Sequence, residues 1–356
     1  MSDGRYIRQT RLAGFGPEGQ KALGQAAVLV VGLGGLGIPA ALYLNAMGVG
    51  RLGLLDADRI ETSNLHRQPL YRESQIGTTK VSALAHSLRA QNPETRLDCM
   101  EVFLTPENAL EILGDYDLIL DATDNLPTRY LLDDACLILG KPWIYGALHG
   151  FEGQVSVFNY RGGPTYRCLF PDPPDADTIP DCSDLGILGV LPGIIGMFQA
   201  LEAVKIIAGL SGVLSGQLCL YDGLSQETRG ITVPRNPDRP QPGQLQQTYA
   251  LHCPSREYSI SWEEFRLRQG RSQTMRLVDV RERYEYKADG LEEAVNLPLA
   301  SLSNHLDNLN GANPLVLVCR SGPRSRKARR FLAERFPDKD IFWISGGMQA
   351  IKSDVL

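Results

Sequence analysis

A glycine-rich turn near the N-terminus constrains the fold of this chain more than any other feature. The turn, Gly32-Leu33-Gly34-Gly35-Leu36-Gly37, lies between an apolar, β-branched run at Ala26–Val31 and a segment of helical length at Ile38–Met47. Its glycines permit a tight turn and a close approach of backbone to phosphate, and the N-terminus of the following helix favours an anion. This arrangement predicts the first unit of a buried parallel sheet that binds a nucleotide.

The same alternation of strand and helix continues to about residue 146. Further strands are expected at Arg51–Asp56, Leu97–Val102, Asp117–Asp121 and Trp143–Gly146, and helices at Lys80–Gln91 and Thr128–Leu139. The alternation predicts a Rossmann-like α/β domain whose mainly parallel sheet is covered by helices on both faces. From Gly153 the pattern changes to short strands, at Gln154–Phe158 and Gln217–Tyr221, with a long helix at Ile194–Ala208 between them.

A second, smaller α/β domain is expected after a proline-rich segment. Residues 234–247 hold four prolines among polar residues, which is typical of a linker. Beyond it the pattern predicts helices near Trp262–Gln269 and Ser325–Phe336, and strands at Arg276–Val280, Leu315–Val318 and near Asp340–Ile344. The predicted organisation is a domain over residues 1–235, a linker over 236–254 and a second domain over 255–356.

Composition excludes several classes of protein. The net charge of −5 gives no reason to expect nucleic-acid binding. No unbroken run of about 18 apolar residues is present, and Met1–Arg11 is polar and charged, so neither a membrane span nor a signal peptide is expected. The seven cysteines are odd in number and scattered, which favours a reducing, cytoplasmic location.

Charged residues near the expected strand ends indicate which nucleotide would bind. Asp56 ends the second strand, where an acidic side chain can hold a ribose. Arg67 and Lys80 would bring positive charge to a triphosphate, although either alone could be a solvated surface residue. Asp124 follows a later strand and is placed to hold Mg²⁺ on the phosphates, the alternative being a helix N-cap before Pro127. The glycine turn by itself equally suits an NAD(P)-dependent oxidoreductase.

Several dispersed motifs in order identify a family. They are Arg8-Gln9, the glycine turn, Asp56-Ala57-Asp58, Ser63-Asn64-Leu65-His66-Arg67-Gln68, Gly77-Thr78-Thr79-Lys80 and Asp121-Ala122-Thr123-Asp124-Asn125. Over roughly residues 5–235 the chain resembles the bacterial adenylyltransferases that activate ubiquitin-like sulfur carriers, such as the molybdopterin-synthase and thiamine-biosynthesis activating enzymes.

The resemblance implies a reaction and a role for each matching residue. The carboxylate of a carrier that ends in Gly-Gly would attack the α-phosphate of ATP, giving an acyl-adenylate and pyrophosphate. Gly35 would lie against the nucleotide, Asp56 would bind the ribose, and Asp124 would position Mg²⁺. Arg8 resembles an arginine finger that reaches into the partner protomer's site, which implies a homodimer. The remaining nucleotide-binding residues would be Asn64, Arg67, Gln68 and Lys80.

Two cysteine positions depart from the family or leave an alternative open. Cys182 matches a crossover-loop cysteine that takes the carrier in some members; the alternative is an inert thiol whose pKa is raised by the neighbouring acidic residues Asp181 and Asp184. The family usually holds structural zinc with two Cys-x-x-Cys pairs. Here the first pair is reduced to Thr165 and Cys168, and residues 235–242 contain no cysteine, so no zinc site is expected.

A reactive cysteine is predicted in the second domain. Cys319-Arg320-Ser321-Gly322-Pro323-Arg324 connects an expected strand to a basic helix, where backbone N–H groups and the helix N-terminus lower a thiol pKa. With Leu277–Arg281 and Gly346-Gly347, residues 257–350 resemble a rhodanese domain, although Ala288–Ala294 replaces its usual His-Ile-Pro-Gly-containing stretch.

The second resemblance completes the predicted function. It implies that Cys319 carries a persulfide, that Arg320 and Arg324 attract an anionic donor such as a persulfide or thiosulfate, and that Asp279 braces the loop. The chain is thus predicted to adenylate a sulfur carrier and convert it to a thiocarboxylate, with Cys182 cleaving an acyl-disulfide. The alternative to an enzyme is a carrier-binding scaffold without activity, which the missing zinc cysteines would suit.

Overall fold

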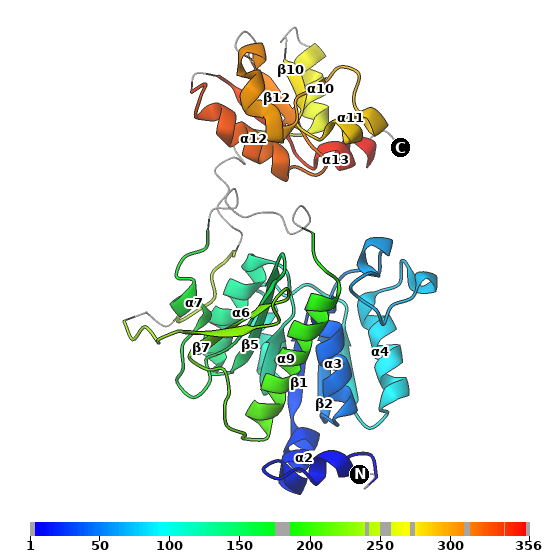
Figure 1. Ribbon diagram of the computed structural model, residues 1–356, viewed down its shortest axis with the longest axis vertical. Coiled ribbons are helices and arrows are strands. Elements are labelled where there is room, and N and C mark those ends of the chain that lie inside the picture. The colour runs from blue at the N-terminus through cyan, green and yellow to red at the C-terminus, as the bar shows by residue number, and fades with distance from the viewer. Residues whose placement is uncertain are drawn as a thin grey trace. The chain divides into compact units, whose positions relative to one another are not determined.

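The computed structural model describes residues 4–174, 186–238, 242–249, 258–270, 275–309, 314–337 and 339–353. These residues form two compact units (Figure 1). The first takes in the described residues up to 173 and from 186 to 249, and the second those from 258 onwards. The predicted boundaries at 235 and 254 stay predictions.

The first unit is built on a mixed sheet with the strand order β3-β2-β1-β4-β5-β6-β7-β8. Its parallel strands are β1 (Ala27–Val31), β2 (Arg51–Leu55), β3 (Arg96–Met100), β4 (Leu118–Asp121) and β5 (Trp143–His149). The antiparallel strands are β6 (Glu152–Phe158), β7 (Gln217–Asp222) and β8 (Thr228–Thr232). The predicted mainly parallel sheet is therefore confirmed.

Register brings the motif-bearing strand ends to one edge of this sheet. Val31 at the end of β1 pairs with Leu55 of β2 on one side and with Asp121 of β4 on the other. The glycine turn and the segments that begin at Asp56 and Ala122 therefore leave the sheet side by side. Parallel α/β sheets bind ligands at this carboxyl edge, next to the point where the strand order reverses.

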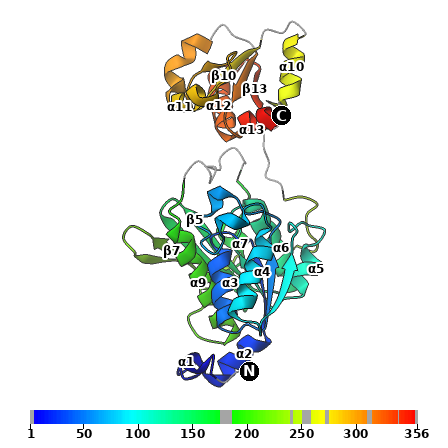
Figure 2. The same ribbon diagram turned by 90° about the vertical axis from the view of Figure 1, so that its right-hand side faces the viewer.

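Helices cover both faces of the sheet, as expected from buried strands. Side chains of β1 alternate between two cores: Val28 and Val30 pack with one set of helices, and Leu29 and Val31 with the other. Figure 1 shows α3, α4 and α9 neighbouring one another on one face, while Figure 2 also brings α5 into view. The helices are α1 (Ile7–Thr10), α2 (Gly16–Gln25), α3 (Gly37–Ala46), α4 (Lys80–Gln91), α5 (Ala109–Gly114), α6 (Leu126–Leu139), α7 (Tyr166–Leu169) and α9 (Val190–Ile207).

Helix α9 is the core helix of the first unit. Among the described residues it alone has the length and apolar composition that a membrane-spanning helix needs, and half of it is buried. Leu191, Ile195 and Ala203 are buried, and the helix packs on α3, β5 and β6. The buried apolar face of α9 is thus covered by other elements of the first unit.

The second unit is a parallel sheet with the strand order β11-β10-β12-β13-β9. Its strands are β9 (Ser259–Ile260), β10 (Arg276–Asp279), β11 (Val295–Asn296), β12 (Leu315–Val318) and β13 (Ile341–Ile344). Its helices are α10 (Trp262–Gly270), α11 (Arg283–Asp289), the 3₁₀ segment η5 (Leu299–Leu309), α12 (Pro323–Ala333) and α13 (Gly347–Ser353). The predicted small α/β domain is confirmed, and the sequence patterns had missed β9, β11, α11, η5 and α13.

Candidate functional site

The glycine turn packs directly against the loop that follows β4. Gly32 has a φ of 91°, and a Cβ atom there would lie 2.7 Å from the Ala122 carbonyl oxygen and 3.2 Å from the Thr123 nitrogen. No other residue fits this conformation and this approach without strain. A glycine is therefore required at position 32 by the contact between the two loops, as well as by the space that a phosphate needs.

Asp56 fixes the conformation of the glycine turn. Its Oδ2 accepts a hydrogen bond of 2.7 Å from the Leu33 N–H, and its Oδ1 accepts one of 2.8 Å from the Asp58 N–H. From the other side, the Tyr71 hydroxyl donates to the Leu33 carbonyl at 2.9 Å, and burial raises the pKa of Tyr71 well above its usual value. The turn is thus held in shape by side chains of the chain itself.

Lys80 is buried beside these carboxylates. Its side chain is 8% exposed, and its Nζ lies 2.7 Å from Asp58 Oδ2 and 3.8 Å from Asp56 Oδ2. It begins α4, for which Thr79 is the N-cap and accepts a hydrogen bond from the Ser82 N–H. The alternative of a solvated surface lysine is therefore wrong, and its ammonium group is fixed at the carboxyl edge of the sheet.

The segment from Asn64 to Gln68 closes a second side of the site. Gln68 is 2% exposed, and its Nε2 lies 3.5 Å from the point where Gly34 would carry a Cβ. Its Oε1 is buried without a hydrogen-bond partner in the described part of the chain. A buried acceptor of this kind costs stability unless something donates to it. This oxygen is therefore available to a donor on a bound nucleotide.

Arg67 lies where the glycine turn meets the start of α9. A Cβ on Gly35 would lie 3.2 Å from the Arg67 carbonyl oxygen and 2.7 Å from Pro192 Cβ. The Arg67 guanidinium donates to the Ser63 carbonyl at 2.9 Å. Asn64 is mostly buried, and its Oδ1 accepts a hydrogen bond from the Glu61 N–H at 3.3 Å. Its side chain thus shapes this segment.

Asp124 is exposed in the loop after β4, beside the glycine turn. The N-cap of α6 is Asn125, whose side chain accepts a hydrogen bond from the Thr128 N–H at 3.0 Å. The alternative of Asp124 as the helix cap is therefore wrong, and its carboxylate remains open to solvent. One carboxylate together with substrate phosphates is a usual donor set for Mg²⁺, so Asp124 fits that ion.

The buried ion pair of Asp121 and Arg129 holds the loop that carries Asp124. Asp121 is fully buried; its Oδ1 accepts from the Thr123 N–H at 3.0 Å, and its Oδ2 accepts from Arg129 Nε at 3.2 Å. The Arg129 guanidinium also donates to the Thr123 carbonyl at 2.9 Å. Burial raises the pKa of Asp121 and outweighs the lowering effect of Arg129. The pair fixes the two residues that precede Asp124.

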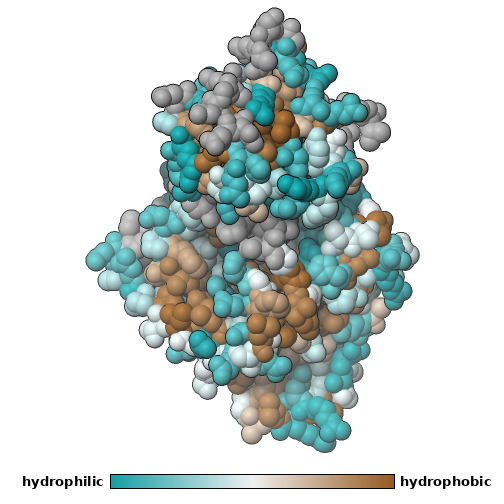
Figure 3. Space-filling view, turned by 45° about the horizontal axis from the view of Figure 1, so that its top comes forward, coloured by the Kyte–Doolittle hydropathy of each residue, from teal (hydrophilic) through white to brown (hydrophobic). Residues whose placement is uncertain are grey.

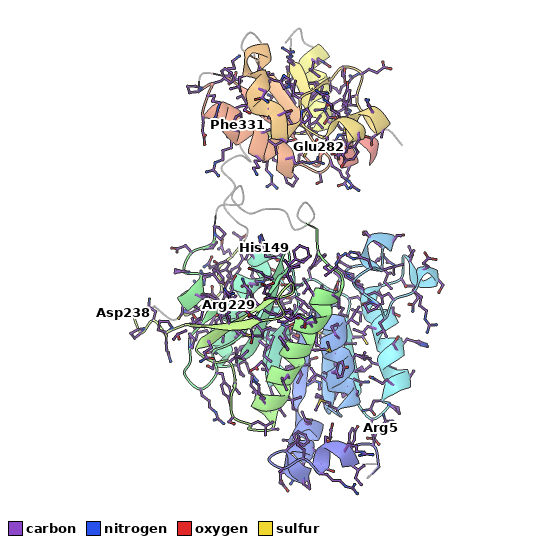
Figure 4. The ribbon with its side chains drawn as sticks, viewed as in Figure 1. Arg5, His149, Arg229, Asp238, Glu282 and Phe331 are labelled. Carbon is purple, nitrogen blue, oxygen red and sulfur yellow. The ribbon has the colours of Figure 1, made fainter. Side chains whose placement is uncertain are left out.

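Arg8 does not reach the nucleotide site of its own chain. It is exposed on α1, which is attached to the C-terminal end of α3 by a 2.9 Å hydrogen bond from Gln9 Nε2 to the Met47 carbonyl. The glycine turn precedes the other end of α3, about 15 Å away for a ten-residue helix. Figure 4 likewise shows Arg5, just before α1, at the opposite end of the first unit from His149, which ends β5.

Cys168 stands at one of the family's usual zinc-binding positions, and its sulfur accepts hydrogen bonds. Cys168 Sγ accepts hydrogen bonds of 3.4 Å from the backbone N–H groups of Thr165 and Asn236. Burial raises the pKa of Cys168, but these hydrogen bonds outweigh it and the pKa is lowered overall. Thr165 takes the place of one ligand of the first cysteine pair and residues 235–242 contain no cysteine, so these positions do not supply the usual four zinc ligands. The absence of zinc stays a prediction. Cys182 and Cys253 lie outside the described residues.

The reactive-cysteine loop follows β12 in the second unit. Cys319 is 1% exposed, and its Sγ accepts a hydrogen bond of 3.1 Å from the Gly322 N–H. Gly322 has a φ of 119°, and a Cβ there would lie 2.8 Å from the Trp343 ring. Helix α12 begins at the next residue, so its N-terminus faces the loop. The sulfur of Cys319 therefore faces a backbone N–H donor and the N-terminus of a helix.

Two of the arginines near this loop are paired with carboxylates. Arg324 binds Glu285 through both terminal nitrogens, at 2.6 and 2.9 Å, and thereby lowers the pKa of Glu285. Arg281 binds Asp279 at 2.8 Å and Asp289 at 2.6 Å. A cavity of about 370 Å³ opens beside them, and its polar lining consists of Arg281, Tyr284, Glu285, Asp289, Arg320 and Gln349.

Sequence reasoning assigned no role to four residues that support these sites. Asp58 and Tyr71 fix Lys80 and the glycine turn, Arg129 balances the charge of Asp121, and Glu285 holds Arg324. The only local signal was the position of Asp58 two residues after Asp56. The other three contacts join residues 8 to 39 positions apart, and nothing in the sequence marks them.

Comparisons with known proteins agree with this arrangement. The family model described as ThiF family matches residues 6–242, and that described as rhodanese-like domain matches residues 261–354. A relative from Drosophila sechellia, the adenylyltransferase and sulfurtransferase MOCS3, is 39% identical over 99% of this chain and 83% of its own length. A sulfur carrier protein adenylyltransferase from Thermus thermophilus is 50% identical over 66% of this chain and 89% of its own length.

Solved structures show a related fold. The crystal structure of E. coli MccB with MccA-N7isoASN superposes with a TM-score of 0.60 at 18% identity. The match covers 68% of this chain and 74% of that one. At this level of identity the likeness concerns the fold alone.

Proposed function

Because the chain belongs to the ThiF family and contains a rhodanese-like domain, we propose that it adenylates a small ubiquitin-like sulfur carrier and converts the carrier's terminal carboxylate to a thiocarboxylate. One observation supports this function best. The register of β1, β2 and β4 brings the glycine turn, the Asp56 and Lys80 cluster and the Asp124 loop to one edge. The same chain also holds Cys319 in a loop where the Gly322 N–H donates a hydrogen bond to the sulfur.

In the first step, a carboxylate oxygen of the carrier's terminal glycine attacks the α-phosphate of ATP. The glycine turn allows the phosphates to approach the backbone, Asp56 accepts from the ribose, and Lys80 and Arg67 offset the phosphate charge. Asp124 would hold Mg²⁺, which neutralises phosphate charge when bound. Pyrophosphate leaves, and the carrier ends in an acyl-adenylate.

In the second step, the terminal sulfur of a persulfide on Cys319 attacks the acyl carbonyl. AMP leaves, and an acyl-disulfide joins the carrier to Cys319. A second thiolate then attacks the Cys319 sulfur, so that the thiocarboxylate is released and a disulfide remains on the enzyme. We assign that thiolate to Cys182, whose position in the sequence matches the crossover-loop cysteine of the family.

The proposed active form is a cytoplasmic homodimer with composite sites. Arg8 is exposed at the far end of α3 from its own glycine turn, so it would act in the site of a second copy. Apolar side chains also reach the surface of the first unit, as Figure 3 illustrates, and on or beside α9 they include Leu188, Met197 and Leu201. Such exposed apolar surface favours a macromolecular partner.

The alternatives explain less of the molecule. The function of an NAD(P)-dependent oxidoreductase does not explain the Cys319 loop. A scaffold without activity does not explain a buried Lys80 or an exposed Asp124 at the nucleotide-binding edge of the sheet. Incubation with ATP, Mg²⁺, a persulfide donor and a ubiquitin-like protein that ends in Gly-Gly should add the mass difference between sulfur and oxygen to that protein. Absence of both this product and carrier-dependent ATP–pyrophosphate exchange, across the Gly-Gly proteins of the source organism, would reject the proposal.

A further inference from the structure

Two arginines near the Cys319 loop are held by carboxylates. Arg324 is engaged at both terminal nitrogens by Glu285, and Arg281 is held between Asp279 and Asp289. Three carboxylates therefore surround these two guanidinium groups. Such bidentate pairs are strong and geometrically fixed.

Arg320 lines the cavity together with Arg281. It is exposed, and the described residues give it no carboxylate partner. Arg281, Arg320 and Arg324 thus stand among three carboxylates, Asp279, Glu285 and Asp289. A single cation is left to meet an incoming anion.

The two donor classes place different demands on this site. When thiosulfate loads Cys319, its outer sulfur forms a bond to the thiolate, its sulfur–sulfur bond breaks, and sulfite leaves with two negative charges. Three negative charges then meet at the loop. When a persulfide on another thiol is the donor, its terminal sulfur moves to Cys319 and a thiolate leaves, so only two negative charges meet. A site with one unpaired cation suits the second reaction better.

Glu285 is held in place from two sides. Besides Arg324, its carboxylate accepts a hydrogen bond of 3.1 Å from the Glu282 N–H at the start of α11. Its side chain is 17% exposed, so solvent screens the pair only in part. The orientation of Glu285 is therefore built into the helix start and does not depend on a bound anion.

We propose that Glu285 determines donor specificity: by occupying Arg324 it weakens the site for thiosulfate and similar dianions, and favours a persulfide presented on another thiol with a single negative charge. This inference rests on the proposed role of Cys319 as the sulfur acceptor. It makes Glu285 a positioning residue, since it acts through Arg324 and does not touch the reacting sulfur.

The test compares two donors on the full chain. Glu285→Gln keeps the shape of the side chain and an oxygen that can accept from the Glu282 N–H, but removes the charge. The KM for thiosulfate, with cyanide as the final acceptor, should fall about ten-fold, because a charge-assisted partner is released to the anion. Loading of Cys319 by a cysteine desulfurase supplied with L-cysteine should change less than about two-fold. The KM of the variant should also rise more steeply with salt than that of the wild type.

Two further variants make the result specific. Glu293→Gln removes the same charge from a pair with Arg266 outside the cavity and should leave the thiosulfate KM unchanged. If Glu285→Gln folds poorly, Glu285→Ala should show the same decrease in the thiosulfate KM. An unchanged thiosulfate KM in folded Glu285 variants, with normal loading by the desulfurase, would overturn the inference alone. Failure of Cys319 to take sulfur from either donor would overturn the sulfurtransferase proposal, and the inference with it.

Discussion

The buried pair of Asp121 and Arg129 provides a quantitative test of how the nucleotide edge is supported. In the variant Arg129→Met, an apolar side chain replaces the guanidinium that lies 3.2 Å from Asp121 Oδ2 and 2.9 Å from the Thr123 carbonyl. Asp121 would then be a fully buried carboxylate without its cation. The variant should weaken both the first unit and the loop that presents Asp124.

Removing one member of a buried ion pair costs about 3–5 kcal/mol, since the remaining charge stays desolvated. For a unit of this size each kcal/mol lowers the melting temperature by about 2–4 °C, so we expect a decrease of about 6–20 °C. Arg96→Met is the matched control. It removes an arginine that is 71% exposed and lies 3.2 Å from Asp98, and should cost less than about 1 kcal/mol.

The loss of stability caused by Arg129→Met should also depend on pH. Burial raises the pKa of Asp121 above its unfolded value of 3.8, so the folded state binds the proton more tightly, and the contribution of this group to stability declines as pH rises through the folded pKa. Arg129 opposes that rise, and its loss moves the folded pKa further up. The deficit of Arg129→Met should therefore be larger at about pH 8 than at about pH 5.

Calorimetry of the full chain measures this effect, with the transition of the first unit identified by its upward shift on adding ATP. The double variant that adds Asp121→Asn should recover part of the loss, because the uncompensated charge is gone. A decrease of less than about 2 °C for Arg129→Met, equal at both pH values, would show that Asp121 does not depend on this partner.

Four further outcomes are expected. Asp124→Ala should lower carrier-dependent ATP–pyrophosphate exchange about 100-fold, since the phosphates lose their Mg²⁺ ligand; an unchanged exchange rate would remove Asp124 from the mechanism. Elemental analysis should find far less than one zinc per chain, because Thr165 replaces one cysteine of the first pair and residues 235–242 contain none; stoichiometric zinc would contradict this. Mixing Arg8→Ala and Asp124→Ala protomers should restore exchange at one composite site, and no recovery after demonstrated subunit exchange would argue against the dimer. Cys319→Ser should keep exchange near the wild-type rate and abolish thiocarboxylate formation, because a hydroxyl cannot form a persulfide; product at the normal rate would exclude this loop as the donor.

The sequence by itself determined the local elements and the order in which they occur. The predicted helix at Lys80–Gln91 has the same bounds in the structure, and the glycine turn joins β1 to α3 as expected. Apolar periodicity, glycines and caps act over a few residues, so they are readable without a fold. The two family resemblances were readable for the same reason, because their motifs are short and occur in a fixed order.

The tertiary structure alone decided which charges meet. Lys80 pairs with Asp58, which is 22 positions away in the sequence, and Arg324 pairs with Glu285, 39 positions away. Cys168 accepts a hydrogen bond from the N–H of Asn236, 68 positions away. The structure also shows that Asn125 and not Asp124 is the N-cap of α6, which leaves the Asp124 carboxylate open to solvent. Such contacts depend on strand register and on the packing of helices against the sheet, which arise from many weak interactions spread over the whole chain. No single stretch of sequence contains that information.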